Sequence, residues 1–325
     1  MIVTFEDDCW SLDDDVWRRS LVEILVLLAM RPQHSVWANP AAMLPWCGEH
    51  LRLHADYFKV RLASAVSRAN SLKISVSPTG ASVIAGDPPW ALTASAACEL
   101  INRPLRVVLE NDHSDRLFIE STVQSFSRWR ANGWLTPAMG GGSAMKRDIA
   151  ATAGDVVARW RTFYLFDSDR LHPSELAAGW KPPRGDSCQG HQFEVACGSI
   201  PRARWHRLER RSIENYLPAV VLQGVNAGAA ATLFGASVGA MANFYNVKQG
   251  LAGDGVLPPN PTNATRAARS QGFWTALRAA EITSLETGFG PHVSNEFQNV
   301  PPAFAWPPDV LREMDGVAQA LLDAI

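Results

Sequence analysis

Charged residues are scarce in this sequence. Asp, Glu, Lys and Arg make up 19% of its 325 residues, and the formal net charge is only −2. Such a chain has no general electrostatic attraction for nucleic acid. A polyanionic partner would therefore have to be held by a local basic patch or through bound metal. The apolar fraction of 47% is typical of a folded globular protein rather than a disordered one.

Cysteine is also rare and forms no disulfide pattern. The five scattered cysteines are Cys9, Cys47, Cys98, Cys188 and Cys197. This odd number argues against a disulfide scaffold and favours a reducing cytoplasm. Cys188, His191 and Cys197 have the spacing of part of a zinc site, but a fourth ligand at the usual spacing is missing. Buried thiols are the preferred interpretation.

The chain lacks a long hydrophobic run that would predict a membrane span. Residues 21–30 are strongly apolar, but they are too few to cross a bilayer and include Glu23. Residues 215–247 carry no Asp, Glu, Lys or Arg and contain two G-x-x-x-G spacings, which membrane helices use. Their many small residues favour closely packed helices in a globular core instead. The acidic N-terminus lacks the basic part of a secretory signal, so we expect a cytoplasmic protein without membrane contact.

A chain of this length is expected to form two or three units. We expect an N-terminal accessory α+β domain at 1–102, a catalytic domain at 103–225 and a helical C-terminal region at 226–325. In the first unit the patterns predict helices at 16–30, 51–70 and 90–101, and a hairpin formed by 72–76 and 81–85. In the last unit they predict a helix at 273–287.

The middle unit alternates apolar segments with amphipathic ones, which is typical of a parallel sheet covered by helices. The predicted strands are residues 105–109, 133–138, 162–166 and 204–208. The predicted helices are residues 115–129, with Ser114 as its N-cap, and 144–160. The fold class expected for this unit is therefore α/β.

Carboxylates follow two of these predicted strands. Glu110 ends the first strand, and Asp167 and Asp169 come directly after the third. Ligands of open α/β sheets bind in the crevice at the carboxyl ends of the strands. Carboxylates that converge there raise one another's pKa, and a divalent cation with a preference for oxygen ligands removes the conflict. The pattern predicts a metal site suited to phosphate chemistry.

Several motifs in this unit together resemble a known family. They are a strand ending in Glu110, Asp115 at the start of a helix, the loop Gly140-Gly141-Gly142-Ser143, the Asp167-Ser168-Asp169 pair, and Arg211-Ser212-Ile213-Glu214-Asn215-Tyr216-Leu217. In this order they are similar to the TOPRIM (topoisomerase–primase) fold. The last motif is similar to an element of TOPRIM nucleases of the overcoming-lysogenisation-defect type and their relatives in bacterial antiphage systems. The resemblance covers about residues 105–220, with weaker similarity as far as Lys248.

The sequence differs from the pattern of this family in three respects. The usual first motif is Glu-Gly-x-x-Asp, whereas here Asn111 replaces the glycine and Asp115 comes one residue late. Asp112 or Asp115 could take the acidic role, and Asp115 is preferred because it opens the helix. The phosphate-binding motif G-x-x-x-x-G-K-[ST] is missing, so an ATPase, if one is needed, would be a separate polypeptide. No tyrosine has a recognisable topoisomerase strand-cleavage context.

The resemblance implies a site with two Mg²⁺ or Mn²⁺ ions that clamp the attacking and leaving oxygens of a phosphodiester. Asp167 and Asp169 would share one or both ions. Glu110 would bind the second ion, and Glu214 would complete the coordination of the first ion. Asp115 would act as a ligand or orient one.

Other residues are expected to contact the phosphate or the nucleic acid. Ser143, with the backbone N–H groups after the glycines, would bind phosphate at a helix N-terminus. Lys248 would stabilise developing negative charge. The arginine-rich segment 202–211, including Arg207, Arg210 and Arg211, is predicted to form a local basic patch that holds nucleic acid.

The resulting hypothesis is a metal-dependent TOPRIM endonuclease that acts in antiphage defence with a separate ATPase or sensor partner, plausibly as a homodimer. DNA, RNA and tRNA all remain open as substrates. Two alternatives are kept: a primase-type nucleotidyl transferase, and a non-catalytic regulatory or partner-binding protein on the same fold. In the simplest structural interpretation, Asp167-Ser168-Asp169 is only a solvated turn, and the arginines pair with Glu194 and Glu209.

Overall fold

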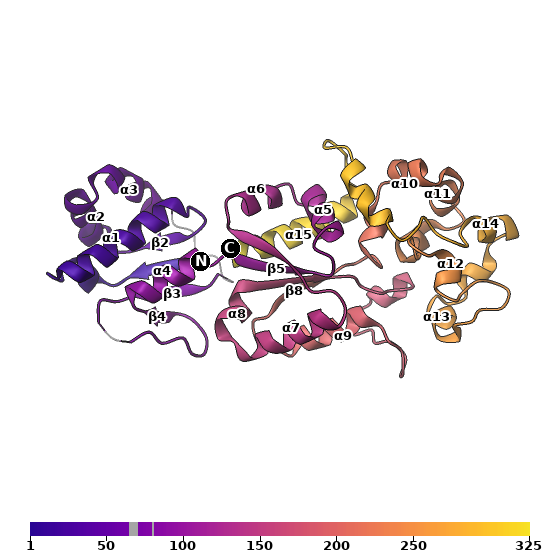
Figure 1. Cartoon of the computed structure of the whole chain (residues 1–325), viewed down its shortest axis with the longest axis horizontal. Coiled ribbons are helices and arrows are strands. Elements are labelled where there is room, and N and C mark those ends of the chain that lie inside the picture. Colours follow the sequence, from indigo (N-terminus) through magenta and orange to yellow (C-terminus); the bar gives the residue numbers. More distant parts are fainter. Residues whose placement is uncertain (65–70, 80) are drawn as a thin grey trace.

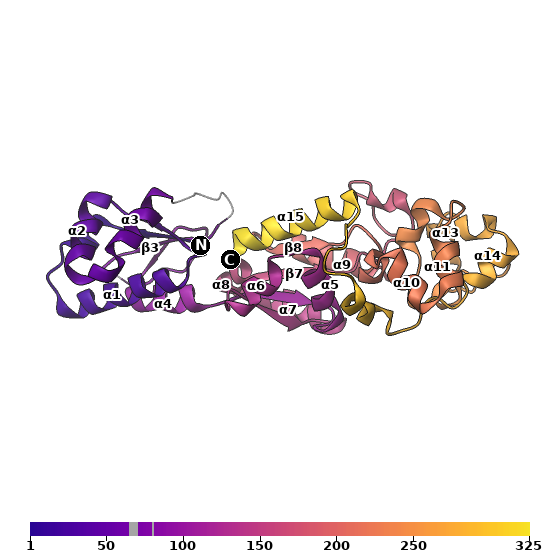
Figure 2. The same cartoon turned by 90° about the horizontal axis from the view of Figure 1, so that it is seen from above.

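The computed structural model describes residues 1–64, 71–79 and 81–325. Figures 1 and 2 show an elongated molecule with three parts in a row. One small sheet with its helices lies at one end, a second sheet lies in the middle, and short helices fill the other end. Each four-stranded sheet is entirely parallel, so the chain is an α/β protein.

The N-terminal sheet has the strand order β2-β1-β3-β4. Its strands are β1 (Ile2–Phe5), β2 (Ser35–Trp37), β3 (Lys73–Val76) and β4 (Trp90–Leu92). Its helices are α1 (Asp15–Met30), α2 (Pro40–His50), α3 (Ala55–Ala63) and α4 (Ala94–Asn102), with two 3₁₀ turns, η1 (Asp7–Trp10) and η2 (Arg52–His54). Asp14 caps α1 by accepting a hydrogen bond from Trp17 N at 2.6 Å.

Three expectations for this unit are wrong. The helix expected at 90–101 begins only at Ala94, because Trp90–Leu92 form strand β4. The unit is α/β rather than α+β, because β3 pairs in parallel with β1 and β4 instead of forming a hairpin. Among the described residues of the expected hairpin, Val83 makes an isolated antiparallel bridge, to Ala91. The strands β1 and β2 were not predicted, because strands of four and three residues carry almost no periodicity. Of the helix expected at 51–70, α3 forms the middle, and 65–70 lie outside the described residues.

The second sheet has the order β6-β5-β7-β8, as the alternating pattern predicts for a parallel sheet. Its strands are β5 (Leu105–Leu109), β6 (Leu135–Met139), β7 (Thr162–Phe166) and β8 (Arg204–Arg207). Its helices are α5 (Ser114–Thr122), α6 (Phe126–Ala131), α7 (Ser143–Gly154), α8 (Val156–Arg161) and α9 (Gln189–Gly198), with one 3₁₀ turn, η3 (Pro173–Leu176). The two long helices expected at 115–129 and 144–160 are each split into two.

Alternate residues of the central strands enter two different cores. Leu109 and Leu165 pack with α5, α6 and the last helix. Tyr164 and Phe166 pack with Met145 of α7 and with α9. Because both faces are covered, β5 and β7 are apolar except for Arg106 and Thr162, which is why they could be recognised in the sequence.

The C-terminal part consists of short helical segments and one long helix. The segments are η4 (Ile213–Tyr216), α10 (Ala219–Val225), α11 (Ala227–Leu233), η5 (Gly239–Phe244), α12 (Gly250–Gly253), α13 (Ala264–Arg269), η6 (Phe273–Ala276), α14 (Ala279–Ser284) and η7 (Val293–Asn299). The helix expected at 273–287 is wrong, because extended backbone at Leu277 and Arg278 divides it. Within the described ranges, no helix is both long and apolar enough to cross a membrane.

The last helix, α15 (Pro308–Ala324), returns from the helical end and lies along the second sheet (Figure 2). Its buried face contributes Val310, Met314, Val317 and Leu321 to the core of that sheet. The chain from 308 onward is therefore structurally part of the sheet unit, which the boundary placed at 226 did not anticipate.

Candidate metal centre

The site begins where the two central strands end. β5 and β7 are adjacent and parallel, so Glu110 and Asp167 leave the sheet at the same edge. Asp167 N donates a hydrogen bond to Glu110 Oε1 at 3.1 Å, and Ile213 N donates to Asp167 Oδ1 at 3.0 Å. The structure thus brings together the two strand-end carboxylates expected from the sequence, in the crevice where α/β sheets bind ligands.

Asp115 joins them from the first turn of α5. Its Oδ2 accepts a hydrogen bond from Asn111 N at 3.0 Å, and its Oδ1 accepts one from Ser114 Oγ at 3.2 Å. Asn111 accepts hydrogen bonds through its Oδ1 from His113 N and Ser114 N in the turn before α5. The N-cap of α5 is His113, and Ser114, which we expected there, is the first helical residue. Asp112 is exposed on the same turn, whereas Asp115 is only 7% exposed and lines the site.

Glu214 and Lys248 complete the cluster. Glu214 lies in η4 with 1% of its surface exposed, and its Oε1 is 2.8 Å from Lys248 Nζ. Its Oε2, equally buried, accepts no hydrogen bond from the residues that the structure describes. Lys248 is held in place by the turn after α14, where Gly290 N donates to Lys248 O at 3.0 Å. A buried carboxylate oxygen without a donor is costly, so this atom needs a cation or a water.

All of these side chains except that of Glu214 line one cavity of about 410 Å³. The charged residues on its wall are Glu110, Asp115, Asp167 and Lys248. Its rim also holds two histidines and two polar side chains that the sequence analysis did not assign to the site: His113, His292, Ser294 and Asn295. Because η7 lies about 180 residues after α5 in the chain, only the folded structure could place its residues here.

The carboxylates repel one another strongly. Burial raises the pKa of Asp167 well above its ordinary value, and the charges of Glu110 and Glu214 raise it further. Burial, with the charge of Asp169 next, raises the pKa of Glu110 to about 7. Burial also raises the pKa of Asp115 to about 6. Lys248 alone leaves this cluster with an excess of negative charge, which a divalent cation would offset.

In the metal-free protein the raised pKa of Glu110 makes stability depend on pH. The folded state binds a proton more tightly than the unfolded chain, so this contribution is present at low pH and is lost as pH rises through about 7. We expect the free energy of unfolding in EDTA to fall by about 2–3 kcal/mol between pH 5 and pH 8. Urea denaturation at both pH values measures this change. In a Glu110→Gln variant the fall should be smaller, with the part due to Asp115 and Asp167 remaining; an equal fall would contradict the assignment to Glu110.

Asp169 lies on the other side of the same loop. It has a left-handed backbone (φ 54°), and its Oδ2 accepts a hydrogen bond from Gly190 N at 2.8 Å. It lines a separate, smaller cavity of about 140 Å³ together with Arg266 and Arg269. The structure therefore does not place Asp169 on the wall of the cavity that Asp167 lines. A Cβ at position 190 would collide with the backbone oxygens of Asp167 and Ser168, so only glycine allows this approach.

The arginines expected to form a nucleic-acid patch make hydrogen bonds and ion pairs with other groups of the protein. Arg207 is 6% exposed and donates to Ser168 O and Glu194. Arg210 donates to Asn215 O and Asp309 Oδ2, at 2.7 and 2.9 Å. Arg211 forms a two-pronged ion pair with buried Asp254.

The same segment also holds the aspartate loop through its backbone. Ser168 N and Asp169 N both donate to Arg211 O, at 2.9 and 3.0 Å. The expected patch of Arg207, Arg210 and Arg211 is thus not an exposed surface. These residues instead fix the loop that carries Asp167.

The glycine loop is explained by close packing rather than by phosphate binding. A Cβ at Gly140 would collide with Val108, and one at Gly141 with Glu110 O, while Gly142 has φ +57°. Gly141 lines the carboxylate cavity, but Ser143 is exposed, is the first residue of α7 and does not line it. The structure therefore gives Ser143 neither the capping contact nor the place at the site that we expected.

The Ile-Glu-Asn-Tyr-Leu segment has a separate contact for each polar residue. Asn215 Nδ2 donates to Ala242 O and Tyr245 O, both at 3.0 Å, and so anchors the segment that leads to Lys248. Tyr216 Oη donates to Glu313 Oε2 of α15 at 2.6 Å. With Asn215 and Tyr216 fixed, Glu214 is directed to Lys248 and the carboxylate cluster.

The donor set fits a divalent cation, although the side chains would have to turn toward it. Across residues 1–64, 71–79 and 81–325, no three His, Cys, Asp or Glu side chains are arranged to hold an ion as they stand. The unpaired oxygen of Glu214 and the mutual repulsion of its neighbours are the observations that favour metal. The zinc alternative has no comparable support, because Cys197 of α9 lies in the apolar core with Phe166 and Met145.

Comparisons of the chain with protein-family models, with curated proteins and with solved structures find no match. Any assignment of function therefore depends on the residues and geometry described above.

Proposed function

We propose that this protein is a metal-dependent phosphodiesterase that cuts nucleic acid, with a TOPRIM-like catalytic sheet. The observation that carries the proposal is the convergence of Glu110, Asp115, Asp167 and Glu214, with Lys248, at the carboxyl edge of the second sheet. Three carboxylates and one lysine on a cavity wall, with Glu214 buried against that lysine, have the composition of a site for Mg²⁺ or Mn²⁺ and phosphate.

Glu110, Asp167 and Glu214 are the residues that would hold metal, and Asp115 would orient them. Bound divalent ions would supply a nucleophilic hydroxide and neutralise the phosphodiester. Asn111 and Ser114 fix the carboxylate of Asp115. Lys248, whose side chain is 42% exposed, can contact a phosphate oxygen at the cavity and stabilise the negative charge that develops there.

The biological setting is proposed from the motif resemblance. An antiphage effector of this kind would work in the cytoplasm, as a monomer or homodimer, with an ATPase or sensor supplied by another polypeptide. With Arg207, Arg210 and Arg211 used internally, attraction of the polymer would depend mainly on the metal ions and Lys248.

The test is incubation of purified protein with supercoiled plasmid and with total tRNA, in Mg²⁺, in Mn²⁺ and in EDTA. We expect cutting of one polymer in either metal and none in EDTA. A Glu110→Gln variant should lose cutting, while Glu209→Gln, a matched change outside the cavity, should keep it. Cutting that persists in EDTA or in Glu110→Gln would contradict the proposal. Product that forms only with nucleoside triphosphates would favour the primase-type alternative, and metal binding without cutting would favour the non-catalytic one.

A further inference from the structure

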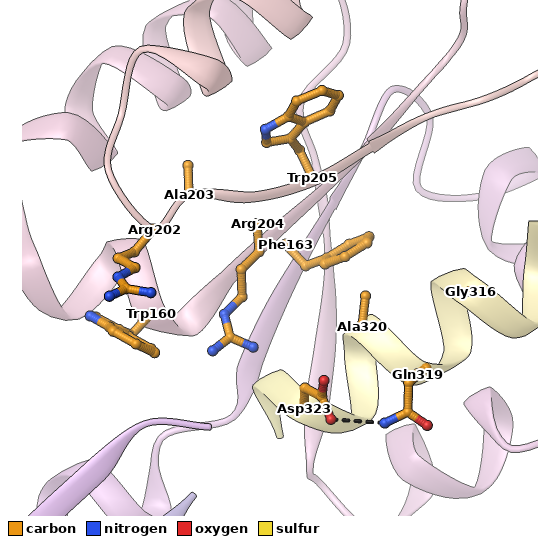
Figure 3. Close-up of a pocket in the computed structure, with 10 residues that line it drawn as sticks. All are labelled: Trp160, Phe163, Arg202, Ala203, Arg204, Trp205, Gly316, Gln319, Ala320 and Asp323. Carbon is orange, nitrogen blue, oxygen red and sulfur yellow. Dashed lines mark hydrogen bonds between the residues drawn. The ribbon is translucent and has the colours of Figure 1, made fainter. Parts of the chain in front are cut away.

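A second cavity of about 480 Å³ lies at the opposite end of the second sheet from the carboxylates. It adjoins the amino ends of β7 and β8 and is closed on one side by the last turns of α15 (Figure 3). Trp160, from the end of α8, forms another wall. The cavity shares no lining residue with the carboxylate site.

Two arginines lie against one indole ring in this cavity. The Cζ atoms of Arg202 and Arg204 are 5.9 and 5.2 Å from the centroid of Trp160, within the range of cation–π attraction. Figure 3 shows both guanidinium groups beside the ring. Trp160 is only 7% exposed, so the ring is a fixed support for them.

A third arginine, Arg161, follows Trp160 in the chain and lines a neighbouring cavity, while Arg202 is itself 3.4 Å from Asp87. Arg161 is 3% exposed and donates to Ala324 O at 2.7 Å and to Ile325 O at 3.3 Å. Its pKa is lowered to about 10 by burial and by the charges of Arg204 and Arg103. Burial lowers the pKa of Arg204 to about 10 as well, although Asp323 opposes the change. An anion bound at Arg204 would offset part of the positive charge that lowers the pKa of Arg161.

The rest of the wall is apolar and flat, with polar groups at the rim. Phe163, Trp205 and Ala320 supply the apolar surface. On α15, Gln319 Nε2 donates to Asp323 Oδ1 at 2.8 Å, which places an amide and a carboxylate beside that surface. A ligand that fits both the apolar wall with its polar groups and the arginine pair has a planar ring with hydrogen-bonding edges and an anionic group. The volume is in the range of small-molecule sites.

We propose that this cavity binds a nucleoside phosphate, with the base on the aromatic wall and the phosphate at Arg202 and Arg204. The nucleotide would act as an effector rather than as the substrate, because the carboxylates lie at the other end of the sheet. α15 connects the two ends: Asp323 lines this cavity, and Glu313 binds Tyr216 beside Glu214.

The test is titration of the full-length protein with ATP and with GTP, followed by tryptophan fluorescence and calorimetry. EDTA is present throughout, so that binding does not depend on the metal site and failure here leaves the nuclease proposal unaffected. We expect a nucleotide to bind at least about tenfold more tightly than adenosine or inorganic phosphate alone, because each of these offers only half of the contacts.

Two substitutions at one position locate the site. Gly316 lines the cavity on α15, and a Cβ there would meet no atom within 4 Å. Gly316→Ala and Gly316→Glu should both fold, since each favours the helix over glycine. We expect Gly316→Ala to bind nucleotide like the wild type and Gly316→Glu to bind at least about tenfold more weakly through charge repulsion. An Arg204→Gln variant should also weaken binding.

Absence of nucleotide binding at millimolar concentration would overturn the proposal. Equal binding by the wild type and Gly316→Glu would overturn it too, because the ligand would then lie elsewhere. Binding of a single-stranded oligonucleotide that is sensitive to Gly316→Glu, without binding of free nucleotides, would assign the surface to nucleic acid instead.

Discussion

Replacement of Asp167 by asparagine is expected to abolish metal-dependent cutting and to make the metal-free protein more stable. Loss of a residue that only orients a ligand costs about 10–100-fold, so loss of a ligand should cost at least about 100-fold. Stability should rise because the buried carboxylate, whose pKa burial and its neighbours hold well above the ordinary value, is replaced by a neutral group of the same shape. Asn Oδ1 can still accept the hydrogen bond from Ile213 N.

Cleavage assays and urea denaturation at pH 8 in EDTA measure the two effects. We expect the variant to unfold at a higher urea concentration than the wild type, because it no longer buries a carboxylate whose pKa is raised. Asp112→Asn is the matched control, because Asp112 is exposed and lies outside the cavity; neither property should change. A variant of Asp167 that is inactive and also clearly less stable would show that the residue serves the fold rather than a metal.

Replacement of Arg211 by methionine is expected to destabilise the protein by about 3 kcal/mol or more. The change leaves Asp254, which is 6% exposed, without its two-pronged partner, and breaking one half of a buried pair costs about 3–5 kcal/mol. Arg266 Nη1 remains 2.7 Å from Asp254, which places the expectation at the lower end of that range. Urea denaturation at pH 7 measures the loss.

Arg312→Met provides the control for this change. Arg312 is a 72% exposed arginine whose nearest carboxylate, on Glu209, is 3.6 Å away, and exposed pairs contribute about 0–1 kcal/mol. If the two variants lose equal stability, the interior role assigned to Arg211 is wrong. If Arg211→Met keeps full stability and instead loses affinity for nucleic acid, the result would support the basic patch expected from the sequence.

The sequence was most informative where burial is complete. β5 and β7 are apolar on both faces, so their ends, and with them Glu110 and Asp167, could be placed to the residue. Segments with little periodicity were not predictable. The strand Ile2–Phe5 is too short to show alternation. The amphipathic patterns also continue past Val123 and Asp155, where the helices end; at Asp155 the side chain caps the next helix, α8.

The candidate site was foreseen in part, for a similar reason. The positions of residues at strand ends can be predicted once the sheet is recognised. His292 and Asn295 reach the cavity only because segments far apart in the chain fold together, and no local sequence pattern predicts this. Arginine clusters are equally ambiguous in a sequence. Whether Arg207 and Arg211 face solvent depends on Glu194 and Asp254, the second of which lies more than forty residues away. Gly190, needed for close approach to the aspartate loop, carried no signal that separates it from other glycines.

The most direct test of the account is calorimetric titration of Mn²⁺ into the metal-free protein, with the wild type, Asp167→Asn and Asp112→Asn compared at pH 7.5. We expect saturable binding by the wild type and by Asp112→Asn, with release of protons because burial raises the pKa of Glu110 to about 7, and loss of binding in Asp167→Asn. Binding of Mn²⁺ by Asp167→Asn with the affinity of the wild type, or no binding by the wild type, would contradict a metal centre at these carboxylates.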